Sequence, residues 1–181
     1  MTNYLRDKFR PIKMMKNVFL TFCFLLLLSS ACTFNKKEQA SGVDYLQGKW
    51  SEDTVENKAQ LVSYQQHDFK FTCDSFYLQI KSYAKVNLNG GVCYDKNSWI
   101  EYAKGYYQLV GDTLKLEGNF VSKQYKFKPE GSCYRVGKYQ ENFIILNKGK
   151  VLELLLIKSL QTSLIHQLKL TEKGSCIIKN N

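Results

Sequence analysis

The sequence contains few of the residues from which hydrolytic and metal-dependent active sites are usually built. Its 181 residues include two histidines, His67 and His166, which are too far apart in the chain to form a local metal-binding motif. Neither a Gly-x-Ser-x-Gly turn nor a glycine-rich phosphate loop is present. His67 and Asp68 are adjacent, so on a strand they point to opposite faces and cannot act together as acid and base. We therefore expect no catalytic residues, no metal site and no cofactor.

The sequence also lacks an apolar run long enough to span a bilayer stably. Val18 to Leu28 is apolar but short, and it follows a positively charged start at Met14-Met15-Lys16. It ends in Ser29-Ser30-Ala31-Cys32, which resembles the site where bacterial lipoproteins are cut and acylated, with Ser29 in place of the usual leucine. This pattern predicts a signal peptide over residues 1–31, with the true start at Met14 or Met15, and lipidation at Cys32. An ordinary secretory signal is the alternative.

A lipidated Cys32, carrying palmitate or a similar chain, implies attachment to a membrane. Residues 32–43 show no periodic apolar pattern and predict a flexible tether behind the lipid. Thr33 is not the aspartate that retains many enteric lipoproteins in the inner membrane. We therefore expect an outer-membrane lipoprotein of the cell envelope, on its periplasmic or surface face.

Basic residues outnumber acidic ones, but they do not form a cluster. The formal net charge is +10, and the first 31 residues supply five of the cations and one of the acids. Later lysines alternate with apolar residues, as in Leu114-Lys115-Leu116. This spacing is typical of the solvated face of a sheet, so we expect no nucleic-acid partner.

Cysteine usage agrees with export. Apart from Cys23 and Cys32, the chain contains Cys73, Cys93, Cys133 and Cys176. An even number of cysteines in an exported chain predicts two disulfides, with three possible pairings, and buried free thiols are the alternative. Because one strand and a glycine-marked turn separate Cys73 from Cys93, we expect these two to pair and Cys133 to pair with Cys176. Their spacing does not suit a zinc ribbon.

From Tyr45 onward, apolar residues recur with a period of two. Phe69 and Phe71 alternate with polar neighbours, and Val110-Gly111-Asp112-Thr113 is a turn between two such segments. Only Val55 to Gln66 could hold a helix of more than two turns, and this segment is weakly amphipathic. Strands are predicted at residues 69–72, 76–81, 99–109, 114–117, 119–127, 133–138, 143–146, 151–158 and 164–171. We expect an all-β domain over residues 44–181, a single antiparallel meander of about eight to ten strands that closes into a barrel, with a sandwich as the alternative.

The segment Gly48-Lys49-Trp50 carries the Gly-x-Trp motif of lipocalins. Over residues 44–172 the chain resembles the small lipocalin-like lipoproteins of Bacteroidetes. This resemblance implies a lipocalin-like barrel in which Trp50 plugs one end, and Arg135 takes the place of the arginine that packs on it. Some such lipoproteins carry the name fumarate hydratase, which implies a hydratase or lyase.

That enzymatic alternative finds little support in the residues. An iron-sulfur hydratase needs three thiolates, and Cys73, Cys93 and Cys133 lie in a chain expected in an oxidising compartment. The Gly-Ser-Ser loop of the cluster-free class is absent. An enzyme therefore ranks last among the possible functions.

Two other classes of function fit the pattern better. The first is a binding protein whose barrel holds a small apolar ligand; the predicted ligand-binding residues are Phe69, Phe71, Phe76, Tyr125, Phe127 and His166. The second is a structural or interaction protein with a filled barrel, whose surface tyrosines, such as Tyr102, Tyr106 and Tyr107, contact a partner.

Overall fold

The computed structural model describes residues 39–55, 57–86, 91–94, 96–147 and 153–177. The predicted signal peptide, the lipidation site Cys32 and the first part of the tether lie outside these residues. Residues Gln39–Asn181 belong to one compact unit. In the part of the chain that the structure describes, no helix is both long and apolar enough to cross a membrane.

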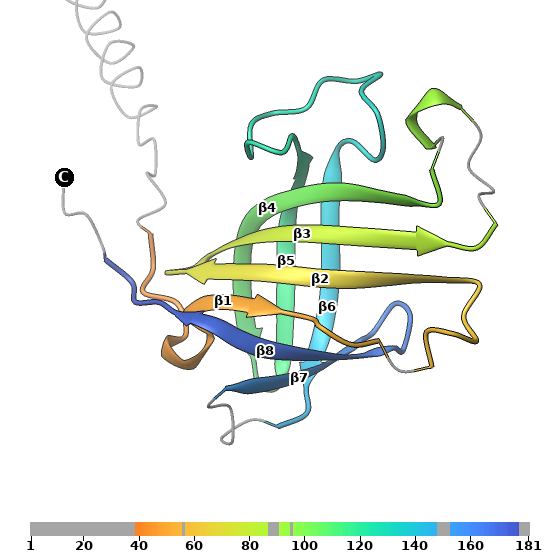
Figure 1. The fold of residues 1–181 in the computed structure, drawn as a ribbon. Coiled ribbons are helices and arrows are strands. Elements are labelled where there is room, and N and C mark those ends of the chain that lie inside the picture. Colours follow the sequence, from red (N-terminus) through yellow and green to blue (C-terminus); the bar gives the residue numbers. More distant parts are fainter. Residues whose placement is uncertain (1–38, 56, 87–90, 95, 148–152, 178–181) are drawn as a thin grey trace, which may run out of the picture. The chain divides into compact units, whose positions relative to one another are not determined.

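Within the described residues, eight antiparallel strands form a closed barrel in which each strand pairs with the next along the chain (Figure 1). The strands are β1 (Gly48–Ser51), β2 (Ser63–Thr72), β3 (Ser75–Ala84), β4 (Ser98–Val110), β5 (Thr113–Val121), β6 (Lys138–Ile145), β7 (Leu154–Ser159) and β8 (Ile165–Lys173). Two short 3-10 helices, η1 (Asp44–Leu46) and η2 (Val92–Tyr94), precede β1 and β4. The prediction of an all-β meander that closes into a barrel is confirmed.

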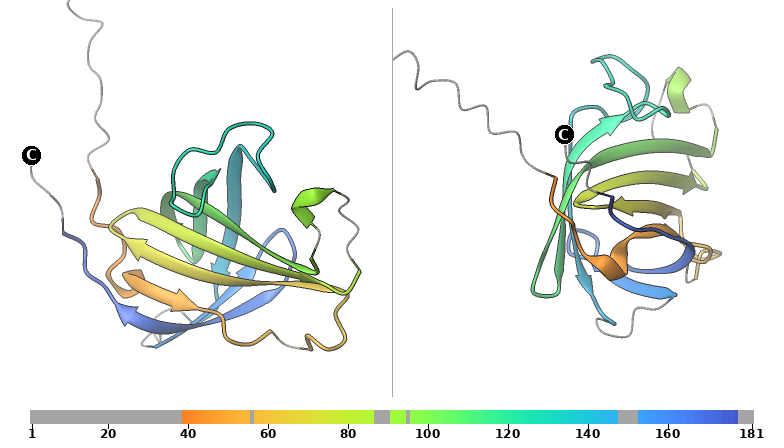
Figure 2. Two further views of the ribbon diagram at one scale, coloured as in Figure 1. Left: turned by 45° about the horizontal axis from the view of Figure 1, so that its top comes forward. Right: turned by 90° about the vertical axis from the view of Figure 1, so that its left-hand side faces the viewer.

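The short strand β1 closes the barrel. Trp50 on β1 is opposite Phe69 on β2 and also opposite Leu170 on β8, so the first strand of the meander pairs with the last. Both views in Figure 2 show the strands curving around one shared interior. Closure makes β2 and β8 near neighbours although about a hundred residues separate them in the sequence.

A close approach between β4 and β5 depends on two glycines. Gly105 is opposite Gly118, and a Cβ added to Gly105 would lie 2.0 Å from the carbonyl oxygen of Glu117. Because the backbones approach so closely here, only glycine fits at these two positions.

The end of the barrel next to η1 is sealed by packed side chains. Trp50 is fully buried, and its indole N–H donates to the Leu46 carbonyl at 2.8 Å. The Gln47 side chain donates to the Cys73 carbonyl at 3.0 Å and accepts from the Cys73 N–H at 2.7 Å. Above this seal the rings of Phe69 and Phe71 stack with centroids 5.5 Å apart. Trp50 is therefore part of the core, as expected for a residue that plugs one end.

Several local predictions were wrong. The segment Val55 to Gln66 contains a turn over residues 57–60 and the start of β2, with no helix among its described residues. Residues 133–137 precede β6 as loop, and β5 ends at Val121 rather than at residue 127. After β5 the chain turns: the Ser122 carbonyl accepts from the Tyr125 N–H at 2.8 Å, and the Lys126 carbonyl from the Ser122 N–H at 3.0 Å.

Two disulfides are present, but the expected pairing was wrong. Cys73 pairs with Cys176, and Cys93 pairs with Cys133, with Cα–Cα distances of 4.6 Å and 5.3 Å. Cys73 follows β2 and Cys176 follows β8, and both of these strands flank β1. The expectation relied on nearness in sequence, whereas closure of the barrel decided which thiols meet.

Arg135 does not pack on Trp50. Its guanidinium donates to the Glu101 carboxylate at 2.9 Å and 2.8 Å and lies 4.5 Å from the Phe120 ring centroid. In the strand register, Glu101 is opposite Ile80, and Ile80 is opposite His67. Glu101 therefore lies further along the barrel from η1 than Trp50 does, because Trp50 is opposite Phe69. The role carried over to Arg135 from lipocalins is therefore corrected.

Candidate functional site

Three buried ionisable side chains meet inside the barrel. Glu52 directly follows β1, His67 belongs to β2 and His166 to β8, and they are 4%, 3% and 5% exposed. Because β1 lies between β2 and β8, inward positions on these three segments are neighbours. Each residue is two positions from an inward apolar side chain, namely Trp50, Phe69 and Leu168. Strand alternation therefore turns all three side chains inward.

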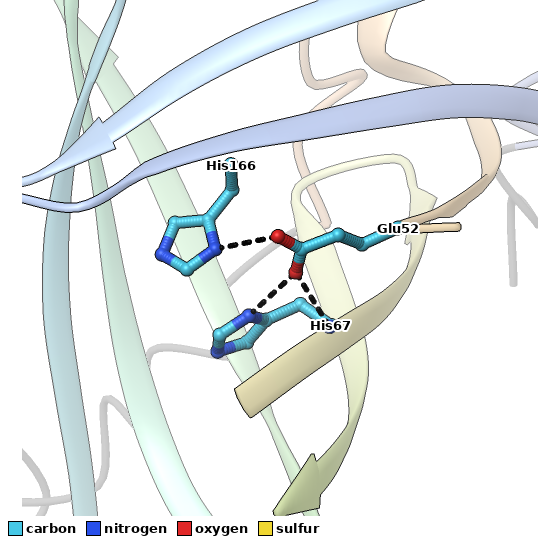
Figure 3. A group of neighbouring side chains, drawn as sticks. All are labelled: Glu52, His67 and His166. Carbon is cyan, nitrogen blue, oxygen red and sulfur yellow. Dashed lines mark hydrogen bonds and ion pairs between the residues drawn. The ribbon is translucent and has the colours of Figure 1, made fainter. Parts of the chain in front are cut away.

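The Glu52 carboxylate bridges the two imidazoles (Figure 3). Its Oε2 lies 3.1 Å from His67 Nδ1 and also accepts the backbone N–H of His67 at 2.9 Å. Its Oε1 lies 3.0 Å from His166 Nδ1. The two ring centroids are 4.5 Å apart with the planes at 78°. A backbone bond from the Glu52 N–H to the His67 carbonyl, at 3.0 Å, holds the carboxylate in place.

Glu52 is ionised at neutral pH. Burial by itself raises the pKa of this carboxyl, but hydrogen bonds from His166 and His67 lower it more, so its pKa lies below the usual value. An ionised carboxylate only accepts hydrogen bonds, so the Nδ1 atoms facing it carry protons. Figure 3 shows both Nε2 atoms turned away from Glu52, and neither has a hydrogen bond within the described chain. The carboxylate therefore fixes the orientation of both imidazoles.

This group of side chains could hold a metal ion. A buried carboxylate is costly away from water unless a cation compensates its charge. A metal ion bound to the carboxylate and to both rings would supply that compensation. Two imidazoles and a carboxylate are a donor set that Zn²⁺ and similar ions prefer, and one donor atom from each residue lies within 4.8 Å of the others.

Two further carboxylates point into the interior, each with its own donors. Glu101 accepts from Arg135 and from the Trp99 indole at 3.2 Å; burial raises the pKa of Glu101 but Arg135 lowers it more, leaving it below the usual value. Glu141 accepts from the Tyr139 hydroxyl at 2.8 Å and from Ser159 at 3.0 Å. Unlike Glu52, neither contacts a histidine.

The predicted ligand-binding residues divide into two groups. Phe69, Phe71 and Phe76 lie inside the barrel and are at most 2% exposed, packed against other side chains. Tyr125 and Phe127 are outside it, in and after the turn that follows β5, and Phe127 is 85% exposed. Neither of these two lines the interior, which corrects that prediction. Tyr107, predicted on the surface, is 5% exposed and belongs to the core, so that prediction is wrong as well.

Sequence reasoning located one of the three residues at the centre of the site. His166 is predicted as a ligand-binding residue of the barrel, and the structure places it inside the barrel, where its hydrogen-bond partner is the Glu52 carboxylate. The sequence pattern does not single out Glu52, and around His67 it draws attention only to the neighbouring Asp68. Glu52 lies two residues after Trp50, so strand alternation indicates that its side chain points inward. Alternation along one strand does not show which other strands become its neighbours.

No protein-family model, curated protein or solved structure matches this chain.

Proposed function

We propose that this chain is an envelope lipoprotein with a lipocalin-like barrel that binds a divalent transition-metal ion at Glu52, His67 and His166. The observation that carries the proposal is the buried carboxylate that holds both histidines of the chain in one orientation. Two imidazoles and a carboxylate form a donor set for such an ion, which takes the place of the two Nδ1 protons when it binds. The signal-peptide pattern, Cys32 and the two disulfides support export and anchoring.

The packing of the interior favours a small ion over an apolar ligand. Phe69 contacts Phe71 on one side and Phe143 on the other, with centroids 5.5 Å and 6.1 Å apart. An apolar ligand would have to displace these rings, whereas an ion needs only the space between donor atoms. Native mass spectrometry of protein from its own host separates the two, because a retained metal and a retained apolar molecule differ in mass.

The direct test is calorimetric titration of the full chain with Zn²⁺, in detergent and without a histidine tag. One ion per chain is expected. Glu52→Gln, His67→Gln and His166→Gln are each expected to weaken binding at least tenfold. Glu101→Gln is the matched control, because it removes a buried carboxylate that has no histidine partner, and it should leave Zn²⁺ affinity unchanged.

Nitrogen NMR provides a second readout. The chain has two histidines, so ¹⁵N-histidine labelling reports His67 and His166 alone. Zn²⁺ is expected to shift ring-nitrogen resonances of both residues together. Absence of binding heat and of ring-nitrogen shifts in folded wild-type protein would overturn the proposal, as would equal loss of affinity in Glu101→Gln.

A further inference from the structure

We propose a second binding site, on the outside of the barrel, for an oligosaccharide that carries carboxylate groups. A cavity of about 790 Å³ lies there, within the range of ligand pockets, which is about 300 to 1,000 Å³. Outward residues of β1 to β4 and the turn after β5 line it, among them Asp68, Lys70, Tyr77, Lys104 and Tyr125. The metal site does not use these side chains.

The backbone of the turn after β5 is strained to bring one aromatic ring to the cavity. Tyr125 has a φ of 55°, in the left-handed region that a tyrosine rarely adopts. Its ring contacts Tyr77 and Tyr102 edge to face, with centroids 5.1 Å and 5.7 Å apart. Ser122 stabilises the turn, because its hydroxyl accepts the Lys126 N–H at 3.2 Å. Strain of this kind is retained where a side chain must be held in one place.

The charges around the cavity favour an anion. Lys70 and Lys104 form no ion pair within the described residues, and Lys70 lies 6.0 Å from the Tyr77 ring centroid. The carboxylate of Asp68 is occupied: Lys81 pairs with it at 2.8 Å and Gln79 donates to it at 3.1 Å. Lys70 also interacts with the exposed Glu172 carboxylate, which pairs with Lys49. Around the cavity, lysines outnumber carboxylates, with Lys49, Lys70, Lys81 and Lys104 against Asp68 and Glu172, so the local field is positive and attracts carboxylates.

The remaining lining suits a ligand rich in hydroxyl groups. Gln124 and Thr171 provide donors and acceptors beside the tyrosine rings. The Tyr77 and Tyr125 planes meet at 88°, so they form no parallel slot for a flat base. Sugar rings have apolar C–H faces that pack on aromatic rings and hydroxyl edges that hydrogen-bond to amides. An acidic sugar chain thus matches the rings, the amides and the lysines together.

The test is calorimetric titration of the full chain with trigalacturonate, with neutral maltotriose as the matched ligand. Trigalacturonate is expected to bind saturably and at least tenfold more tightly than maltotriose. Tyr125→Gly removes the ring while permitting the positive φ, so it should fold and weaken binding at least tenfold. Lys104→Ala should weaken binding of the acidic sugar and reduce its salt dependence.

The control is Lys115→Ala, which removes an exposed lysine of β5 that does not line the cavity. It should bind trigalacturonate as wild type does. Absence of saturable binding up to about 10 mM, equal affinity for the two sugars, or wild-type affinity in Tyr125→Gly would each overturn the proposal. Zn²⁺ titration of Tyr125→Gly should match wild type, so the two proposals fail independently.

Discussion

At the scale of single residues, the barrel is distinguished by buried carboxylates that have specific donors. Glu52 and Glu101 are 4% exposed each, and both have pKa values below the usual one because their partners offset the effect of burial. Each carboxyl group therefore loses its proton at a lower pH in the folded state than in the unfolded chain. The stability of the protein must therefore depend on pH on the acid side.

The acid dependence can be tested at Glu101. A carboxyl whose folded-state pKa is lowered contributes stability above its unfolded pKa, about 4.5, and loses it as the pH falls through the lower folded value. We expect the urea midpoint of wild type to fall below about pH 4.5, and Glu101→Gln to make this fall shallower. Urea unfolding from pH 7 downward measures it. An acid limb identical to that of wild type would contradict the assignment.

The two tryptophans should differ sharply in their contribution to stability. Trp50 is fully buried at the sealed end, so Trp50→Ala is expected to cost about 3 to 5 kcal/mol. Trp99 is only half-buried, so Trp99→Ala should lower the free energy of unfolding by less than Trp50→Ala does. Denaturant unfolding of both variants, with iodide quenching of the remaining indole, measures this. A loss below about 1 kcal/mol at Trp50, with free quenching, would show a surface residue.

Metal entry is expected to be slow. Glu52, His67 and His166 are 3–5% exposed, so an ion must wait for local opening of the barrel end. Stopped-flow mixing with Zn²⁺ should give a rate that levels off as the Zn²⁺ concentration rises, because opening becomes limiting. A rate that stays proportional to concentration would indicate an open site.

At the scale of elements, strand alternation was predictable but the ends of strands were not. The hairpin at Gly111 is in place between β4 and β5, because a turn there agrees with both the local sequence and the sheet. The segment after Val121 also alternates, yet it turns, because Ser122 supplies local hydrogen bonds that compete with the sheet. Alternation alone cannot weigh these bonds against strand pairing.

The close approach of β4 and β5 can be tested by comparing Gly105, where the two backbones meet, with Gly111 in the turn between these strands. Gly105→Ala would place a Cβ 2.0 Å from backbone, so the strands must separate and the cost should be about 2 to 4 kcal/mol. Gly111→Ala meets no atom within 4 Å, and only its φ of 62° opposes the change, so about 1 kcal/mol is expected. Urea unfolding of both variants provides the comparison. Equal costs would show that the close approach is not needed.

At the scale of the whole molecule, closure of the barrel brings together residues from its two ends. The Cys73–Cys176 bridge joins the turn after β2 to the chain after β8 across 103 residues, whereas Cys93–Cys133 spans 40. Replacing either pair by alanine should cost about 2 to 5 kcal/mol, with the larger loss at Cys73–Cys176, because the longer loop constrains the unfolded chain more. Thermal unfolding of the two double variants measures it, and the reverse order would contradict it.

Anchoring is also a property of the whole molecule. Cys32→Ala is expected to release the protein from membranes, because the proposed lipid is attached there. Fractionation together with palmitate labelling of wild type measures this. A variant that stays in the membrane fraction, with unlabelled wild type, would contradict the lipoprotein assignment.

The alternation of apolar and polar residues sufficed to predict an all-β meander and the inward positions of Phe69 and Phe71, but it left a closed barrel and a sandwich as alternatives. These features depend on neighbours along one strand, and such neighbours are visible in a sequence. The contacts of Glu52 with His67 and His166, and the pairing of Cys73 with Cys176, were decided by the tertiary structure. These contacts depend on β1 lying between β2 and β8. The residues near Glu52 in the sequence do not indicate that β8, more than a hundred residues later, pairs with β1 and completes the barrel.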